Sequence, residues 1–224
     1  MIITKKEARE NAREYALRQI RENIENLQLK PGSAVSENEL AKELGISRTP
    51  VREALQELHK NKMIEVYPQK GIIISHIDFE VVNEMVFLRR VLEKAVVEEL
   101  CDNISQENIL ELEKNIQLQE FYLDKQLPQK ILELDNEFHR SLFVMSHKER
   151  IYHLMEATQG HFNRIRTMSV FSVKELKIIE DHKAIVGAIK SKDKVLAGEI
   201  ILSHLSRYKL DQNEIMEKYP EYFK

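Results

Sequence analysis

The amino-acid sequence predicts a mainly α-helical protein, with a winged helix-turn-helix in its first third and an all-α helical bundle after it. Three observations support this prediction. Apolar residues recur at helical spacing over most of the 224 residues. The chain has only 6 glycines and 5 prolines, and many of them fall between residues 31 and 71, where short elements are therefore expected. One β-hairpin pattern follows these short elements.

The first element is predicted to be a helix over residues 5–27. Thr4 and Glu7 have the spacing of a capping box, in which each side chain bonds the backbone N–H of the other residue. The dipeptide Pro31-Gly32 then favours a turn. A second element is therefore expected soon after residue 32.

Two shorter helices are predicted next. Ser36 can cap the first of them, with Glu39 three residues later as its capping-box partner. Gly45 stands where a helix commonly ends in a left-handed residue. Ser47 can cap the following helix, and Pro50 is tolerated there because first-turn N–H groups have no partner within the helix. This spacing is typical of a helix-turn-helix.

A β-hairpin is predicted after these helices. Residues 64–67 and 72–74 are rich in β-branched residues and are joined by the turn Pro-Gln-Lys-Gly. The order helix, helix, turn, helix and hairpin is the plan of a winged helix-turn-helix. The N-terminal domain is therefore predicted to span residues 1–77.

The remainder of the chain, residues 78–224, is predicted to form a helical domain. Asp78, Ser105, Ser172 and Asp193 can serve as N-caps, and Ser172 and Glu175 have capping-box spacing. Six amphipathic helices are expected, over residues 79–101, 105–124, 127–145, 148–170, 173–190 and 194–216. Six helices of this length suggest a bundle.

Composition and charge exclude several classes of protein. The chain has no apolar run of 18 residues, and its N-terminus lacks the hydrophobic region of a signal peptide, so a cytoplasmic protein without a membrane partner is expected. The single cysteine, Cys101, cannot form an intramolecular disulfide, which agrees with a reducing compartment. The net charge is −3, so any basic surface for nucleic acid must be local.

The third predicted helix begins with two arginines, although a positive charge at a helix N-terminus costs about 0.3–1 kcal/mol. Arg48, Thr49 and Arg52 fall within a sector of about 100° beside the apolar stripe. The N-terminal residues of this helix contact bases and phosphates in helix-turn-helix proteins, and arginine can pair bidentately with guanine. Arg52 has no acid four residues before or after it with which to form an ion pair. Because the helix also belongs to a winged helix-turn-helix plan, DNA contact is favoured over a solvated surface position.

A second group of residues could bind a metal ion. Asp135 and His139 are four residues apart on one predicted helix, so their side chains point the same way. His182 and His204 come from two later helices. If these residues converge, one carboxylate and three imidazoles would suit a divalent transition metal such as zinc, nickel or manganese.

The segment LKPGSAVSENELAKELGISRTPVREALQELHKNKMIEVYPQKGIII, residues 29–74, resembles the DNA-binding domain of GntR-type bacterial transcription regulators, with a distinctive SRTPVREAL core. The resemblance implies contacts with double-stranded operator DNA from Arg48, Thr49, Arg52, Lys70 and Gly71. Many relatives have arginine in place of Asn38, and often in place of Lys70, so a phosphate contact there is expected to be weaker. The operator sequence cannot be transferred from those relatives.

Residues 79–210 are similar to the FadR-type ligand-binding domain of the same regulators. FLRRVLEKAVVEEL matches its first helix, DNEFH its D-x-x-F-H motif, DHKAIVGAIKSKD its histidine-bearing helix and HLSRY its last histidine. In the metal-binding branch of that family the four ligands correspond to Asp135, His139, His182 and His204. Another branch binds fatty acyl-CoA without metal, and the presence of all four ligands argues against that branch.

The resemblance also implies an effector pocket. Arg89 aligns with an arginine that faces this pocket in metal-binding relatives, and Arg164 is predicted to face it as well. A metal ion with open coordination positions and an arginine together suit a small carboxylate, because the guanidinium group pairs with two oxygens at once.

The chain is therefore expected to be a homodimeric, metabolite-responsive transcription regulator and not an enzyme. Two recognition helices related by a two-fold axis would read a palindromic operator. Two alternatives stay open. One is a metal-sensing regulator, in which the ion is the signal, and the less favoured one is a helical-bundle metalloenzyme with Glu137 or Glu180 as its general base.

Overall fold

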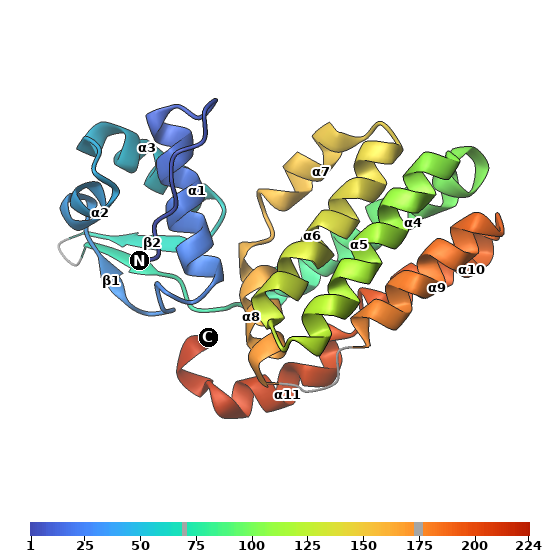
Figure 1. The fold of residues 1–224 in the computed structure, drawn as a ribbon. Helices are drawn as coiled ribbons and strands as arrows, with labels where there is room; N and C mark the ends of the chain where they lie inside the picture. The colour runs from blue at the N-terminus through green and yellow to red at the C-terminus, as the bar shows by residue number, and fades with distance from the viewer. Residues whose placement is uncertain (69–70, 173–176) are drawn as a thin grey trace.

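The computed structural model describes residues 1–68, 71–172 and 177–224, which form two parts that lie side by side (Figure 1). The N-terminal part contains helices α1 to α3 and a small sheet, and the C-terminal part contains helices α4 to α11. The predicted fold class, a winged helix-turn-helix followed by an all-α helical bundle, is confirmed.

Helix α1 (Ala12–Glu25) begins later than the sequence predicts. Asn11 and Glu14 form its capping box, whereas Thr4 and Glu7 do not. The Thr4 N–H donates to Gln19 Oε1 at 2.8 Å, and its hydroxyl accepts from Gln19 Nε2 at 2.7 Å. Because the buried Gln19 side chain bonds to the segment before α1, that segment runs back along the helix and does not extend it.

Helices α2 (Glu37–Leu44) and α3 (Arg48–Lys60) confirm the predicted helix-turn-helix. The Ser36 hydroxyl accepts from the Glu39 N–H at 3.2 Å, and Gly45 ends α2 with φ 66°. Ser47 precedes α3 but makes no side-chain capping bond. The helices bury one shared core that includes Ile20, Ile24, Leu40, Val51, Leu58 and Ile74.

The wing is a three-stranded antiparallel sheet. Strands β2 (Ile64–Tyr67) and β3 (Gly71–Ile74) pair as predicted, with Ile64 opposite Ile74. A short strand, β1 (Ala34–Val35), pairs with the other edge of β3, so the strand order is β1-β3-β2. The tip of the predicted turn, residues 69–70, lies outside the described residues.

The C-terminal part has eight helices among the described residues, and two of the predicted helices are each divided into two. The helices are α4 (Phe79–Asn103), α5 (Gln106–Asp124), α6 (Pro128–Met145), α7 (Glu149–Glu156), α8 (Gly160–Ser172), α9 (Ile178–Lys190), α10 (Lys194–His204) and α11 (Tyr208–Lys218). The divisions fall at residues 157–159 and 205–207. The capping box predicted for Ser172 and Glu175 lies partly outside the described residues, since Ser172 ends α8.

The main core of the C-terminal part lies between helices α4, α5, α6, α9 and α10 (Figure 1). It includes the fully buried side chains of Val97, Phe138, Leu142, Phe143, Ile185 and Ile201. Within the described ranges, every helix is too short or too polar to cross a membrane.

Helix α8 of the C-terminal part contacts both the N-terminal part and the linker between the two parts. His161 Nε2 donates to the Lys62 carbonyl at 2.8 Å, while its Nδ1 accepts from the Asp78 N–H at 3.1 Å. Burial lowers the pKa of His161 to about 4, so the imidazole is neutral and can make both bonds. Arg164 donates to the Ser75 carbonyl at 2.6 Å. These bonds fix the linker between the two parts to α8.

The C-terminal residues hold the same linker from its other side. Phe223 and Ile77 form a parallel β-bridge, and the Phe223 ring stacks on Phe79 with 5.1 Å between ring centroids. The two ends of the C-terminal part therefore meet at the linker.

Candidate functional site

Four of the predicted DNA-contact residues line one groove of the N-terminal part. The groove has a volume of about 510 Å³, runs between α2, α3 and the wing, and is lined by residues that include Asn38, Arg48, Arg52 and Gly71. Thr49 is exposed on the first turn of α3. Lys70 lies outside the described residues. The side chains of Arg48 and Arg52 are 59% and 55% exposed, so a phosphate or a base edge can reach them.

Glu37, at the start of α2, binds both arginines. Arg52 donates to its carboxylate from Nε at 3.1 Å and from a terminal nitrogen at 2.9 Å, and Arg48 does so at 3.5 Å. The hydrogen bond from Arg52 is the main cause of the lowered pKa of Glu37. The ion-pair partner of Arg52 therefore comes from another helix, which spacing within α3 could not reveal.

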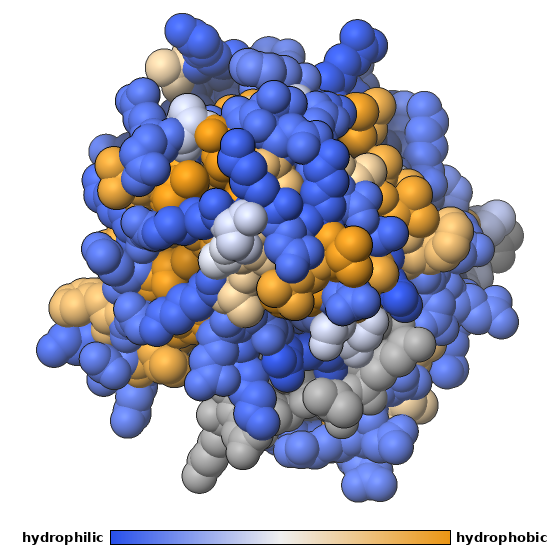
Figure 2. All heavy atoms as spheres, turned by 90° about the vertical axis from the view of Figure 1, so that its right-hand side faces the viewer, coloured by the Kyte–Doolittle hydropathy of each residue, from blue (hydrophilic) through white to orange (hydrophobic). Residues whose placement is uncertain are grey.

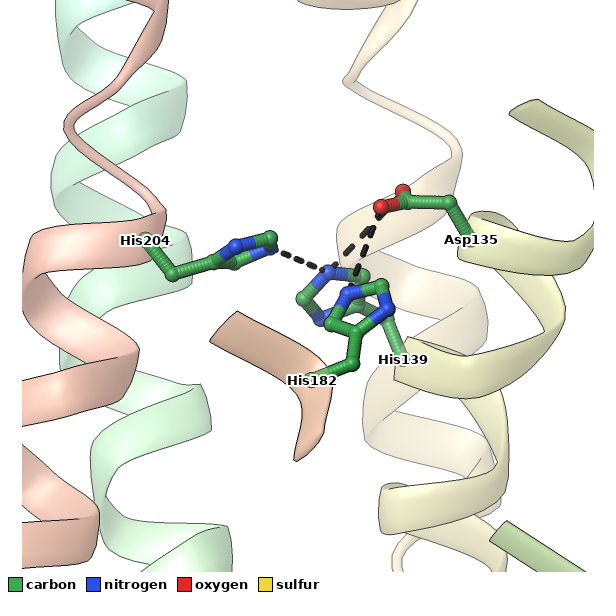
Figure 3. A group of neighbouring side chains, drawn as sticks. All are labelled: Asp135, His139, His182 and His204. Carbon is green, nitrogen blue, oxygen red and sulfur yellow. Dashed lines mark hydrogen bonds and ion pairs between the residues drawn. The ribbon is translucent and has the colours of Figure 1, made fainter. Parts of the chain in front are cut away.

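The four predicted metal ligands meet inside the C-terminal part (Figure 3). Asp135 and His139 come from α6, His182 from α9 and His204 from α10. One ligand atom from each residue lies within 4.8 Å of the others, and all four residues are buried. The fold therefore brings together side chains as far apart in the sequence as Asp135 and His204, which are 69 positions apart.

A hydrogen-bond acceptor outside the group holds each of the three imidazoles. Nδ1 of His139 lies 2.5 Å from Glu93 Oε2, and Nδ1 of His182 lies 2.9 Å from Gln119 Oε1. Nδ1 of the third, His204, lies 3.2 Å from Asp181 Oδ2. Because these oxygens accept, we assign the ring proton to Nδ1 in each case, which leaves the Nε2 lone pairs facing one another.

This arrangement of donors fits a divalent transition metal. Two nitrogens that each lie about 2.0–2.1 Å from one zinc ion are about 2.9–3.4 Å apart when the N–Zn–N angle is between about 90° and 109°. The Nε2 atoms of His139 and His204 are 3.1 Å apart, which is within this range. His182 Nε2 is buried with no hydrogen-bond partner among the described residues. A cation at the centre would satisfy these lone pairs, and three imidazoles with one carboxylate favour zinc, nickel or manganese over calcium or magnesium.

The protonation states also suit metal binding. Burial would raise the pKa of Asp135, but the positive charge of Arg166 is the largest opposing influence, and the pKa lies well below its usual value. Burial lowers the pKa of His139, and that of His182 falls well below its usual value for the same reason. An ionised carboxylate and neutral imidazoles are the forms in which these side chains bind a metal ion.

Arg89 reaches the metal ligands through a carboxylate. The side chain is buried, and its Nε donates to Glu93 Oε1 at 2.6 Å. The other oxygen of Glu93 holds His139, as described above. The Arg89 guanidinium also lies over the Phe162 ring, 5.2 Å from its centroid. Arg89 therefore lies beside the cluster, with part of its hydrogen-bonding capacity committed to Glu93.

Arg164 does not reach the cluster. It is fully buried and bonds to the Gly160 and Ser75 carbonyls at the junction with the N-terminal part. Arg166, two residues later, instead forms an ion pair with Asp135. The predicted placement of Arg164 beside the cluster is therefore wrong, because α8 turns the Arg164 side chain toward the linker.

Four contacting residues escaped the sequence prediction: Glu37, Gln119, Arg166 and Asp181. Glu93 stands four residues after Arg89 on one helix, so an ion pair between these two residues could be expected from the sequence. The other four act on residues of different helices, and their partners depend on how the helices pack.

The comparisons with known proteins agree with this architecture. Residues 13–74 match the family "Bacterial regulatory proteins, gntR family", and residues 84–207 match the family "FCD domain". An uncharacterized HTH-type transcriptional regulator from Streptomyces ambofaciens is 32% identical, over 96% of this chain and 90% of that protein. The HTH-type transcriptional repressor RspR of Escherichia coli is 25% identical, over 91% of this chain and 90% of its own length.

Solved structures share the fold of the whole chain. Escherichia coli McbR/YncC superposes with a TM-score of 0.73 at 19% identity, over 94% of this chain and 99% of that one. A putative GntR transcriptional regulator from Rhodococcus gives 0.68 at 21% identity, over 91% and 96%. The chain belongs to the GntR family of bacterial transcription regulators, in the FadR-like subgroup with an FCD ligand-binding domain, and is not an enzyme.

Proposed function

We propose that operator binding by this regulator is controlled by a small carboxylate bound beside a divalent transition ion in the C-terminal part. The observation that carries the proposal is the buried cluster of one carboxylate and three imidazoles whose Nε2 atoms face one another. Asp135, His139, His182 and His204 would hold the ion, which is zinc, nickel or manganese. When bound, the ion supplies positive charge and open coordination for a carboxylate oxygen.

Two arginines beside the cluster would bind the rest of the carboxylate. The Arg89 and Arg166 guanidinium groups lie 5.2 and 5.8 Å from the centroid of the same ring, that of Phe162. Guanidinium groups present a planar fork that matches two carboxylate oxygens. A small organic acid is therefore the class of effector that the cluster and these two arginines favour.

The N-terminal part would bind double-stranded operator DNA, with a domain boundary between residues 77 and 78. Arg48, Thr49 and Arg52 would enter the major groove on α3. Asn38 would contact the backbone, and Lys70 and Gly71 at the wing would contact the adjacent minor groove, where glycine permits close approach. Glu37 would release the two arginines when DNA supplies the anions.

We further propose that the regulator acts as a homodimer, with the C-terminal parts in contact. Figure 2 shows apolar side chains gathered in several patches among polar ones on one face of this part. Strongly exposed apolar residues of α4 and α10 include Phe87, Val91 and Val195, at 71%, 52% and 71% exposure. A two-fold pair would place two α3 helices on the half-sites of a palindromic operator.

A metal-sensing regulator is the second candidate, and one contact favours it. Asp135 is both a member of the cluster and the ion-pair partner of Arg166 on α8. The same helix carries His161 and Arg164, which bond to the N-terminal part and to the linker. An ion bound to Asp135 would weaken the ion pair between Asp135 and Arg166. Because α8 also contacts the N-terminal part and the linker, this change could reach the DNA-binding part even without an effector.

Isothermal titration of small organic acids into the metal-loaded protein tests the proposal. We expect binding that is lost after chelation and weakened about tenfold by Arg89→Lys, because an ammonium group cannot form the bidentate pair. Arg89→Lys should keep its metal, since the retained charge still pairs with Glu93 and so keeps His139 oriented. Acid affinity that is unchanged by chelation would exclude the ion from the effector site, and wild-type affinity in Arg89→Lys would exclude Arg89.

A further inference from the structure

A cavity between the two parts of the chain has no role in the account above. It has a volume of about 510 Å³ and lies between α1 on one side and α6 and α8 on the other. This volume is within the range of about 300–1,000 Å³ that is usual for small-molecule sites. Any molecule bound there would touch the N-terminal and C-terminal parts at the same time.

Arg166 connects this cavity with the metal cluster. The residue lines the cavity, and its guanidinium donates to Asp135 and to Asn136 Oδ1, the latter at 2.5 Å. If Asp135 ligates an ion, its negative charge is shared with that ion. Arg166 then has positive charge that is no longer balanced, on the wall of the cavity, where an anion can reach it.

The other charged groups of the wall already have partners or can be neutral. Arg18 pairs with Glu22 at 3.5 Å and with Glu10, and the exposed Glu133 pairs with Lys130. Burial raises the pKa of Glu25 to about 7, so this carboxyl group can hold a proton near neutrality. Arg166 is therefore the residue best placed to attract a carboxylate into the cavity.

The remaining wall is rich in groups that form neutral hydrogen bonds. Amide side chains come from both parts of the chain, for example Asn26 and Gln28 from one and Gln129 and Asn163 from the other. Asn163 Oδ1 is buried and has no hydrogen-bond partner among the described residues. A buried acceptor without a partner favours a ligand that donates a hydrogen bond to it.

We propose that this cavity between α1 and helices α6 and α8 binds a small carboxylate that also carries hydrogen-bond donors, such as hydroxyl or ammonium groups. The proposal rests on the proposed function in one respect, that an ion shares the charge of Asp135. The carboxylate binds Arg166 on the metal side, and the donors bind the amide oxygens, including Asn163 Oδ1. The effector then contacts α1 directly and favours the arrangement of the two parts in which the cavity is closed around it.

Four six-carbon probes test the chemistry by isothermal titration into the full-length, metal-loaded protein. Gluconate and 6-aminohexanoate carry a carboxylate with hydroxyl or ammonium donors, hexanoate has only the carboxylate, and glucitol has only the hydroxyl groups. We expect gluconate or 6-aminohexanoate to bind at least about tenfold more tightly than hexanoate and glucitol. The better of these two identifies the kind of donor, while equal binding of all four would overturn the proposal.

Two cavity-filling substitutions test the location, one from each wall. Gln28→Trp and Leu132→Trp should each weaken binding of the better probe at least about tenfold by steric exclusion, with metal content unchanged. Gln106→Trp, at an exposed position on α5 away from the cavity, is the matched control and should bind as the wild type does. If the probe binds both cavity variants with wild-type affinity but still needs Arg89 and the ion, the proposed function stands and the cavity assignment is wrong.

Discussion

Replacing Arg52 by alanine should weaken operator binding by about 1–3 kcal/mol, or about 5- to 150-fold, if its guanidinium group reads a base edge. Arg52 is exposed in the groove between α3 and the wing, and its only ion-pair partner among the described residues is Glu37. Truncation removes a bidentate donor that DNA would otherwise engage. Fluorescence anisotropy with operator DNA at physiological salt measures the effect.

Arg13→Ala is the matched control for this substitution. Arg13 is also an exposed arginine of the N-terminal part paired with a glutamate, Glu57, but it lies on α1, outside the groove. Its removal should change operator affinity by less than about 0.5 kcal/mol, because exposed ion pairs contribute little. If Arg52→Ala and Arg13→Ala bind operator equally well, α3 is not the recognition helix.

Replacing His182 by alanine should weaken metal binding more than about 100-fold, because loss of a ligand costs more than loss of a hydrogen bond to a ligand. His182 is fully buried and contributes the Nε2 atom that lacks a hydrogen-bond partner among the described residues. Elemental analysis after purification without chelators and a competition titration with zinc measure the loss. His153→Ala, which removes a histidine that is 54% exposed, should leave metal content unchanged.

A second substitution separates loss of the ligand from loss of the fold. The His182 ring stacks on Phe138 with 4.0 Å between centroids, so its truncation also leaves a void in the core. Gln119→Leu keeps the ring and removes the oxygen that holds its Nδ1, together with the amide nitrogen that donates to Asn115 Oδ1. It should weaken metal binding about 10–100-fold. Wild-type metal affinity in both folded variants would show that the cluster does not bind the ion.

The sequence predicted best those parts of the fold that depend on local chemistry. Helix α2 begins after Ser36 and ends at Gly45, as predicted. Both signals are local, because a capping bond and a left-handed glycine involve residues only a few positions apart. The start of α1 was predicted wrongly because Thr4 bonds to the side chain of Gln19, a contact between residues 15 positions apart. The breaks at residues 157–159 and 205–207 likewise depend on packing, since one of them brings Gly160 against Met63.

At the candidate site, too, the sequence predicted local spacing well and contacts between helices poorly. The spacing of Asp135 and His139 placed both side chains on one face of α6. His182 and His204 were candidate ligands from later helices, and the family resemblance predicted that they join this pair. Neither could distinguish Arg164 from Arg166, because which residue faces the cluster depends on the rotation of α8 about its axis. The oxygens that hold the imidazoles come from α4, α5 and α9, so they become visible only when these helices are packed together.

Operator affinity, measured with and without a small organic acid before and after removal of the metal, tests the central claim most directly. The account predicts that at least one acid from a panel that includes gluconate and 6-aminohexanoate changes the affinity of the metal-loaded protein by about 5- to 150-fold. The same acid should have no effect after chelation. A change produced by the metal alone would favour the metal-sensing regulator, and an operator affinity that neither the acids nor the metal alter would contradict the account.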